Sequence, residues 1–159
     1  MKQIFEILEK DSRTTPEEIA TMTGIPVAEV EDVISKAEKD RAIVKYKTIL
    51  DWRKLGEAEV LALIEVRIQP QMDVGFDALA ERVYRFPQVR SAYLVSGGYD
   101  LALLVQGKTM HDIADFVAEK LAPLQGVQGT VTHFLLKRYK EDGEILVSGE
   151  EDKRLPITM

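Results

Sequence analysis

The strongest constraint on the fold is the order of the hydrophobic patterns that begins at Val60. The segment 60–69 alternates apolar and polar residues, which predicts a strand with one buried face. The segment 101–105 is continuously apolar, which is typical of a central strand buried on both faces. The predicted order is strand 60–69, helix 74–86, strand 89–96, strand 100–106, helix 109–122 and strand 129–138. This β-α-β-β-α-β order is the ferredoxin-like arrangement.

The residues before this block have helical periodicity. A first amphipathic helix is predicted from Ile4 to about Lys10. The run Thr15-Pro16-Glu17-Glu18 then has the features of a helix start, because Thr15 suits an N-cap, proline suits the first turn and Glu18 completes a capping box. This second helix should end at Gly24 and bury Ile19, Ala20 and Met22. A third helix, reaching about Asp40, should bury an apolar stripe of Val27, Val30, Val33, Ile34 and Ala37.

A small β-ribbon is predicted after the third helix. The segment 43–50 alternates apolar and polar residues, and 51–54 continues as a return strand or a loop. Three short helices and a β-ribbon form a winged helix-turn-helix, with its tight joint at Gly24. The predicted fold class is therefore α+β. Its parts are a winged helix-turn-helix DNA-binding domain (1–54), a linker (55–59), a ferredoxin-like βαββαβ domain (60–147) and a polar tail (148–159).

The composition excludes several classes of protein. The 159 residues include no cysteine and two histidines, so there is neither a disulfide framework nor a histidine-rich metal site. No phosphate loop, dinucleotide fingerprint or serine-histidine-acid set is present, so we expect no catalytic residue, no metal and no cofactor. No apolar run approaches the roughly 20 residues that span a bilayer. We therefore expect a cytoplasmic protein that is not an enzyme and has no membrane partner.

Four motifs, in this order and spacing, resemble the Lrp/AsnC (feast/famine) family of transcription regulators. They are Gly24-Ile25-Pro26 before a Val-x-x-Val-x-x-Val-Ile helix, Ile43-Val44-x-Tyr46, Ser96-Gly97-Gly98-Tyr99-Asp100-Leu101, and Gly126-Val127-x-x-Thr130-x-Thr132. The resemblance covers about Ile4 to Leu146. It implies a regulator of double-stranded DNA whose C-terminal, RAM-type sheets pair face to face in a homodimer, often assembled further into tetramers or octamers. A dimer of this kind should prefer pseudo-palindromic operators.

The resemblance also implies an amino acid or a related small effector bound near the hairpin. Gly98 and Asp100 match the family's effector loop, and Thr130 and Thr132 match the strand that faces it. The backbone N–H groups of a glycine pair can hold a carboxylate, and Asp100 can accept an ammonium group. The same glycines would also fit a tight hairpin without any ligand. The candidate effector residues are Gly97, Gly98, Tyr99, Asp100, Thr130 and Thr132.

The third helix departs from what a DNA-binding helix usually presents. Of its first four outward positions, Ala28, Glu29, Glu31 and Asp32, three are acidic. Carboxylates repel phosphates, so phosphate contacts would have to come from nearby lysine and arginine side chains. The candidate DNA-binding residues are Thr14, Thr15, Ala28, Glu29, Ser35, Lys36, Lys39, Lys45, Lys47, Arg53 and Lys54. The alternative hypothesis is an oligomeric amino-acid-binding or protein-interaction module whose helix-turn-helix binds DNA weakly or not at all.

Overall fold

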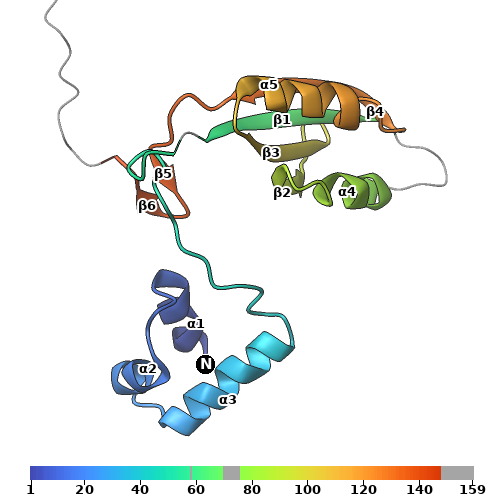
Figure 1. The fold of residues 1–159 in the computed structure, drawn as a ribbon. Helices are drawn as coiled ribbons and strands as arrows, with labels where there is room; N and C mark the ends of the chain where they lie inside the picture. Colours follow the sequence, from blue (N-terminus) through green and yellow to red (C-terminus); the bar gives the residue numbers. More distant parts are fainter. Residues whose placement is uncertain (58, 70–75, 148–159) are drawn as a thin grey trace, which may run out of the picture. The chain divides into compact units, whose positions relative to one another are not determined.

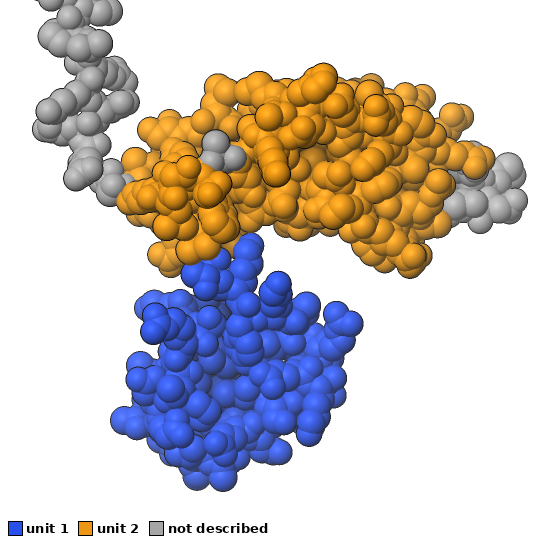
Figure 2. All heavy atoms as spheres, viewed as in Figure 1, with its two compact units in different colours: residues 1–49 blue, residues 50–159 orange. Residues whose placement is uncertain are grey.

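The computed structural model describes residues 1–57, 59–69 and 76–147, and it divides the chain into two compact units. The first unit is Met1–Ile49 and the second begins at Leu50 (Figure 2). One residue of the predicted linker (58), the first two residues of the predicted helix 74–86 and the predicted polar tail 148–159 lie outside the described residues.

The first unit is built from three helices, as the sequence predicted (Figure 1). They are α1 (Lys2–Lys10), α2 (Pro16–Thr23) and α3 (Val27–Lys39). Ile4, Leu8, Ile19 and Val30 form the buried centre of this unit. Two predicted core residues are wrong, because Met22 is 68% exposed and Val27 is 36% exposed. Both lie near the ends of their helices that meet at the α2–α3 joint, where the three-helix core is too small to cover them.

The predicted wing is also wrong. No residue from 43 to 50 belongs to a strand. A strand needs a neighbour for its N–H and C=O groups, and of the two alternatives predicted for 51–54, a return strand or a loop, the structure has the loop, with turns at 52–56. In these turns the N–H of Lys54 donates to the Asp51 carbonyl at 3.0 Å, and the N–H of Leu55 donates to the Trp52 carbonyl at 3.1 Å. The described N-terminal unit is therefore a helix-turn-helix without a β-ribbon.

The second unit has the predicted ferredoxin-like order, which confirms the fold class. Its elements are β1 (Val60–Ile68), α4 (Phe76–Tyr84), β2 (Val89–Leu94), β3 (Leu101–Gly107), α5 (Met110–Asp115), η1 (Phe116–Leu121), β4 (Val127–Phe134), β5 (Lys140–Glu141) and β6 (Glu144–Ile145). The four long strands form an antiparallel sheet in the order β2-β3-β1-β4, and β5 and β6 form a separate hairpin. The sequence did not predict this hairpin, and it placed the end of β4 four residues too late, at 138.

One face of the sheet carries the core. Ala62, Ile64 and Val66 of β1 pack with Leu101, Leu103 and Val105 of β3 against the helices. The predicted helix 109–122 is α-helical only as far as Asp115. It continues as a π-helix, η1, and the N–H of Ala122 donates to the Val117 carbonyl at 2.8 Å. Hydrogen bonds five residues apart bring Phe116 and Leu121 to the same face, and both are buried.

Candidate functional site

The helix-turn-helix is fixed by its helix ends. Thr15 Oγ1 accepts from the N–H of Glu18 at 3.3 Å, and Glu18 Oε2 accepts from the N–H of Thr15 at 2.8 Å, so the predicted capping box is present. Gly24 ends α2 with φ of 72°, a left-handed conformation that favours glycine. Pro26 then precedes α3. These features set the angle at which α3 leaves α2, and they leave one face of α3 open.

The open face of α3 is acidic at its start and basic at its end. Ala28, Glu29 and Asp32 are exposed in the first two turns, whereas Lys36 and Lys39 are exposed in the last two. At the same time, Val30 and Ala37 on the opposite face are buried, and Val30 belongs to the core of this unit. The prediction that these five residues face outward is confirmed, and the first base on this face, Lys36, follows Asp32 by one helical turn.

The remaining candidate DNA-binding residues are dispersed. Thr14 Oγ1 donates to the carbonyl of Asp11, the residue that ends α1, at 2.9 Å, and Thr15 Oγ1 caps the start of α2, so both hydroxyls already have partners in the α1–α2 connection. Ser35 is half-buried, and Lys45 and Lys47 are exposed in the irregular segment after α3. Arg53 and Lys54 belong to the second unit.

Arg53 has a partner within its own turn. Its Nε and Nη2 donate to Asp51 Oδ1 and Oδ2, both at 3.2 Å. Because the Arg53 guanidinium stabilises the ionised carboxylate, it lowers the pKa of Asp51. This two-point contact occupies the guanidinium, so Arg53 would have to exchange Asp51 for a phosphate to act in DNA binding.

In the same segment, the phenol of Tyr46 donates to Glu38 Oε1 at 2.9 Å and so links it to the last turns of α3. Partial burial, the hydrogen bond and the negative charge of Glu38 together raise the pKa of Tyr46. Tyr46 belongs to the motif that the sequence expected to open a wing. Its observed contact is with α3.

The candidate effector hairpin lies between β2 and β3. Gly97 has φ of 147°, and a Cβ added at Gly97 or Gly98 would meet no atom within 4 Å. Of these two glycines, Gly97 has a positive φ and Gly98 does not, so the turn itself does not require a glycine at position 98. The absence of side chains at both positions leaves their backbone open to a ligand.

Asp100 connects this hairpin to the end of β1. Its Oδ2 accepts from the backbone N–H of Ile68 at 2.7 Å, and its own N–H donates to the Val66 carbonyl at 3.0 Å. β3 begins only at Leu101, so the N–H of Ile68 lies beyond the last residue pair of the β1–β3 ladder. The carboxylate supplies the missing acceptor, and Asp100 therefore has a structural role that the sequence did not reveal.

The two threonines lie on the other side of β1. In β4, Thr130 pairs with Val66 and Thr132 pairs with Ile64. Since Val66 and Ile64 point into the core, both threonines belong to the core-facing side of the sheet, where they are half-buried. Thr130 and Asp100 thus flank the same end of β1, about 10 Å apart as two strand spacings require, while Thr132 lies two residues further along.

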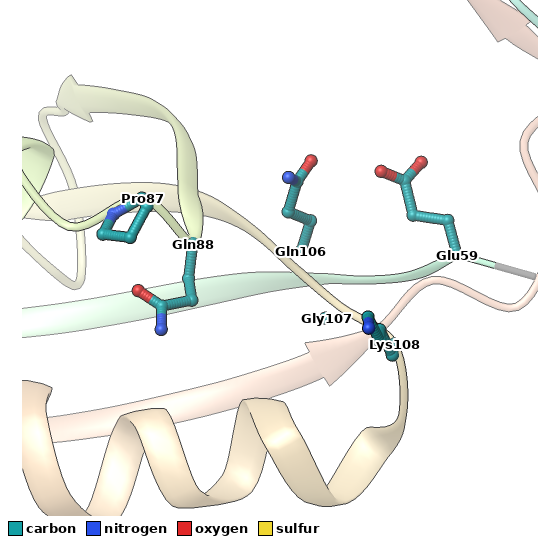
Figure 3. Close-up of a pocket in the computed structure, with 6 residues that line it drawn as sticks. All are labelled: Glu59, Pro87, Gln88, Gln106, Gly107 and Lys108. Carbon is teal, nitrogen blue, oxygen red and sulfur yellow. The ribbon is translucent and has the colours of Figure 1, made fainter.

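A separate pocket of about 300 Å³ lies at the opposite end of the sheet from the hairpin. It is lined by Glu59, Pro87, Gln88, Gln106, Gly107 and Lys108. Figure 3 shows the Glu59 and Gln106 side chains extending to one side of the strands and the Gln88 side chain to the other. The Glu59 carboxylate is also held by Arg90, with Nη1 3.2 Å from Oε2.

Two kinds of site are absent from the part of the chain that the structure describes. Residues 1–57, 59–69 and 76–147 contain no group of three or more histidine, aspartate or glutamate side chains placed to hold a metal ion. No helix in the same residues is long and apolar enough to cross a membrane.

The arrangement defines a class of protein: a helix-turn-helix regulator with a separate ferredoxin-like domain. Residues 61–145 match the family described as the Lrp/AsnC ligand binding domain. The chain is 48% identical over 157 residues to YugG, an uncharacterized HTH-type transcriptional regulator of Bacillus subtilis, covering 98% of this chain and 95% of that protein. The chain belongs to the Lrp/AsnC family of helix-turn-helix transcriptional regulators. This membership confirms the family and the non-enzymatic function that the sequence predicted.

Solved structures share the fold. A feast or famine regulatory protein of Mycobacterium tuberculosis, complexed with L-methionine, superposes with a TM-score of 0.74 at 20% identity, covering 90% of this chain and 94% of that one. A transcriptional regulator of Neisseria meningitidis in a complex with L-Met gives 0.71 at 23% identity, covering 87% and 89%. The two-unit architecture is therefore common to proteins of low sequence identity.

Proposed function

We propose that this regulator binds double-stranded DNA through its N-terminal unit, with α3 in the major groove, and that an amino acid at the hairpin of its C-terminal domain changes this binding. The observation that carries the proposal is the α2–α3 joint. A capped α2, a left-handed Gly24 and a buried inner face of α3 leave the outer face of α3 free to enter a groove. In a helix-turn-helix, the N-terminal half of that helix contacts base edges.

The charge distribution on α3 assigns its two halves different roles. Lys36 and Lys39 supply attraction for phosphates, and Lys45 and Lys47 add to it from the following segment. Carboxylates earlier in the helix contribute no phosphate affinity, although a carboxylate can accept from the N4 amino group of cytosine. The affinity for DNA therefore depends on the basic end of α3, and discrimination between base pairs depends on its acidic end.

A salt titration tests the DNA-binding proposal. The full chain is titrated by fluorescence anisotropy onto its own upstream promoter fragment at several salt concentrations. The double variant Lys36→Gln/Lys39→Gln should bind more weakly, and its slope of log K against log salt should be shallower by about 0.9 for each lost phosphate contact. Lys120→Gln, an exposed lysine in η1 of the other unit, is the control that should leave the slope unchanged. An unchanged slope in the double variant would remove α3 from the DNA interface.

A second candidate function is protein recognition by the same helix. The observation that favours it is that the side chains of Glu29, Glu31 and Asp32 are exposed and make no hydrogen bond or ion pair within the described residues. Reversal of all three to arginine should create DNA affinity if the acids are what prevents binding. If the parent chain does not bind DNA at low salt and the reversed variant does, the acids are what prevents DNA binding, which favours protein recognition over DNA recognition by this helix.

The proposed effector is an amino acid, bound by the open backbone of Gly97 and Gly98 with Asp100, Tyr99, Thr130 and Thr132 nearby. The support is the match of residues 61–145 to a ligand-binding domain and the L-methionine complexes of two structural relatives. In the same anisotropy assay, L-methionine and a panel of other amino acids should change the DNA dissociation constant. No change with any amino acid would separate the hairpin from regulation while leaving DNA binding intact.

We also propose a homodimer, and larger even-numbered assemblies, formed through the face of the sheet opposite to the helices. Leu63, Leu104, Tyr93 and Val131 lie on this face, and Tyr93 and Val131 are 59% and 48% exposed. An uncovered apolar sheet face of this kind fits a second copy, because a two-fold axis brings the same face onto itself. Such a dimer, acting in the cytoplasm, would place two α3 helices on pseudo-palindromic half-sites about one helical turn apart.

A further inference from the structure

One ion pair lies on the apolar sheet face that the proposed dimer buries. His133 of β4 lies 3.2 Å, Nε2 to Oε1, from Glu65 of β1. Residues 65 and 133 alternate with the core residues Ile64 and Val66 and with the core-packed Phe134, so both side chains point to the open face. The His133 side chain is 50% exposed and the Glu65 side chain is 30% exposed, so a second sheet packed on this face would cover both.

The surroundings of His133 supply no other close countercharge. Arg67 of β1 is the other charged residue that alternation places on the open face of the paired part of β1. The open-face residues of β3 carry no charge, and the titratable residues of β2 are Tyr93 and Arg90, which lies at the register shift between Val89 and Ser91. On β4, Val131 and Leu135 are the open-face neighbours of His133. The Glu59–Arg90 pair links the start of β1 to β2 and is neutral as a unit.

We propose that dimerisation through the open face is coupled to protonation of His133, so that the dimer is tighter at about pH 5.5 than at about pH 8. This inference rests on the dimer proposed above. When His133 is protonated, it and Glu65 enter the interface as a neutral pair. When His133 is neutral, the Glu65 carboxylate loses the partner 3.2 Å away, and Arg67, two residues along the same face, is the cation that remains on β1; burial of a carboxylate with a weaker ion pair is less favourable.

Linkage fixes the sign and the size of the effect. The dimer binds protons more tightly than the monomers do, so association weakens as the pH rises through the range in which histidine titrates. The two-fold axis places two such pairs in each dimer. A tenfold preference for the protonated form at each of the two pairs gives a rise in the dimer dissociation constant of about fiftyfold from pH 5.5 to pH 8.

The chain provides its own control. His111, the other histidine, is 3.5 Å from Asp115, Nε2 to Oδ2, but this pair lies on α5 with side chains that are 84% and 52% exposed. Sedimentation velocity over a dilution series, at constant ionic strength, gives the dimer dissociation constant of the parent chain at several pH values. The same series is measured for His133→Gln, Glu65→Gln and His111→Gln.

We expect the dimer dissociation constant of the parent chain and of His111→Gln to rise with pH. For His133→Gln and Glu65→Gln we expect a dissociation constant that does not change with pH. A parent dimer whose dissociation constant does not change with pH would overturn this inference alone. Retention of the pH dependence by His133→Gln would also overturn it. A chain that is monomeric at every pH would overturn the proposed dimer together with the inference.

Discussion

Replacement of Asp100 tests whether the hairpin is held in place by a side chain or only by its backbone. Asp100→Ala removes the acceptor of the Ile68 N–H, a bond of 2.7 Å to a carboxylate. Ile68 is only 8% exposed, so water does not readily replace the lost acceptor. The variant therefore leaves a buried donor without a partner at the end of β1.

The expected cost follows from that geometry. Loss of a hydrogen bond to a charged acceptor, with the donor left buried, lowers the free energy of unfolding by about 2 kcal/mol. For a unit of roughly 100 residues this lowers Tm by about 10 °C. Asp100→Asn keeps an oxygen in the same place without the charge, so its cost should be below about 1 kcal/mol. Asp115→Ala, which removes an exposed partner of His111, is a control expected to cost less than about 0.5 kcal/mol.

Amide hydrogen exchange locates the effect at one residue. In Asp100→Ala the Ile68 amide should exchange about 30-fold faster than in the parent chain, which corresponds to about 2 kcal/mol. In Asp100→Asn its protection should be nearly retained. Equal protection of Ile68 in the parent and in Asp100→Ala would refute the assigned hydrogen bond. The Asn variant also separates two roles: loss of amino-acid binding with the hairpin intact would show that the ligand needs the carboxylate itself.

Two further predictions concern the helix starts. Thr15→Ala should destabilise α2 by about 1 kcal/mol, visible as faster exchange of the Glu18 amide, and Thr15→Ser should restore it; no difference between Ala and Ser would mean that the capping box contributes nothing. The Thr109 N–H donates to the Asp112 carboxylate and lowers its pKa, so this carboxylate contributes stability above about pH 4 that is lost as the pH falls through the depressed pKa. In unfolding measured from about pH 6 to pH 2, Asp112→Asn should therefore lose less stability on the acid side than the parent chain. An unchanged profile would contradict the assignment.

The sequence predicted the elements whose signals are local. The capping box at Thr15, the left-handed Gly24 and the alternation of β1 each depend on residues that are close in the chain. The C-terminal hairpin had a local signal as well, which the sequence analysis did not use. Asp142-Gly143 adopts positive φ at both residues, 44° and 89°, and Asp-Gly is a typical two-residue hairpin turn. The prediction of a wing at 43–50 was wrong because its signal is not local: an alternating segment becomes a strand only if a partner strand pairs with it.

The role of Asp100 shows why a candidate site is harder to predict than a fold. Residue type and resemblance placed Asp100 in the effector loop, but its partner is a backbone N–H 32 positions earlier in the chain. This N–H has no partner in the ladder because β1 extends beyond the last residue that pairs with β3. The same holds for Glu65 and His133, which are 68 positions apart and meet through strand register alone. A sequence pattern identifies which residues can carry charge or accept hydrogen bonds. Which of those charges already have partners depends on pairings between distant strands. These pairings determine whether a residue is available to bind a ligand or stabilises the fold around the binding site.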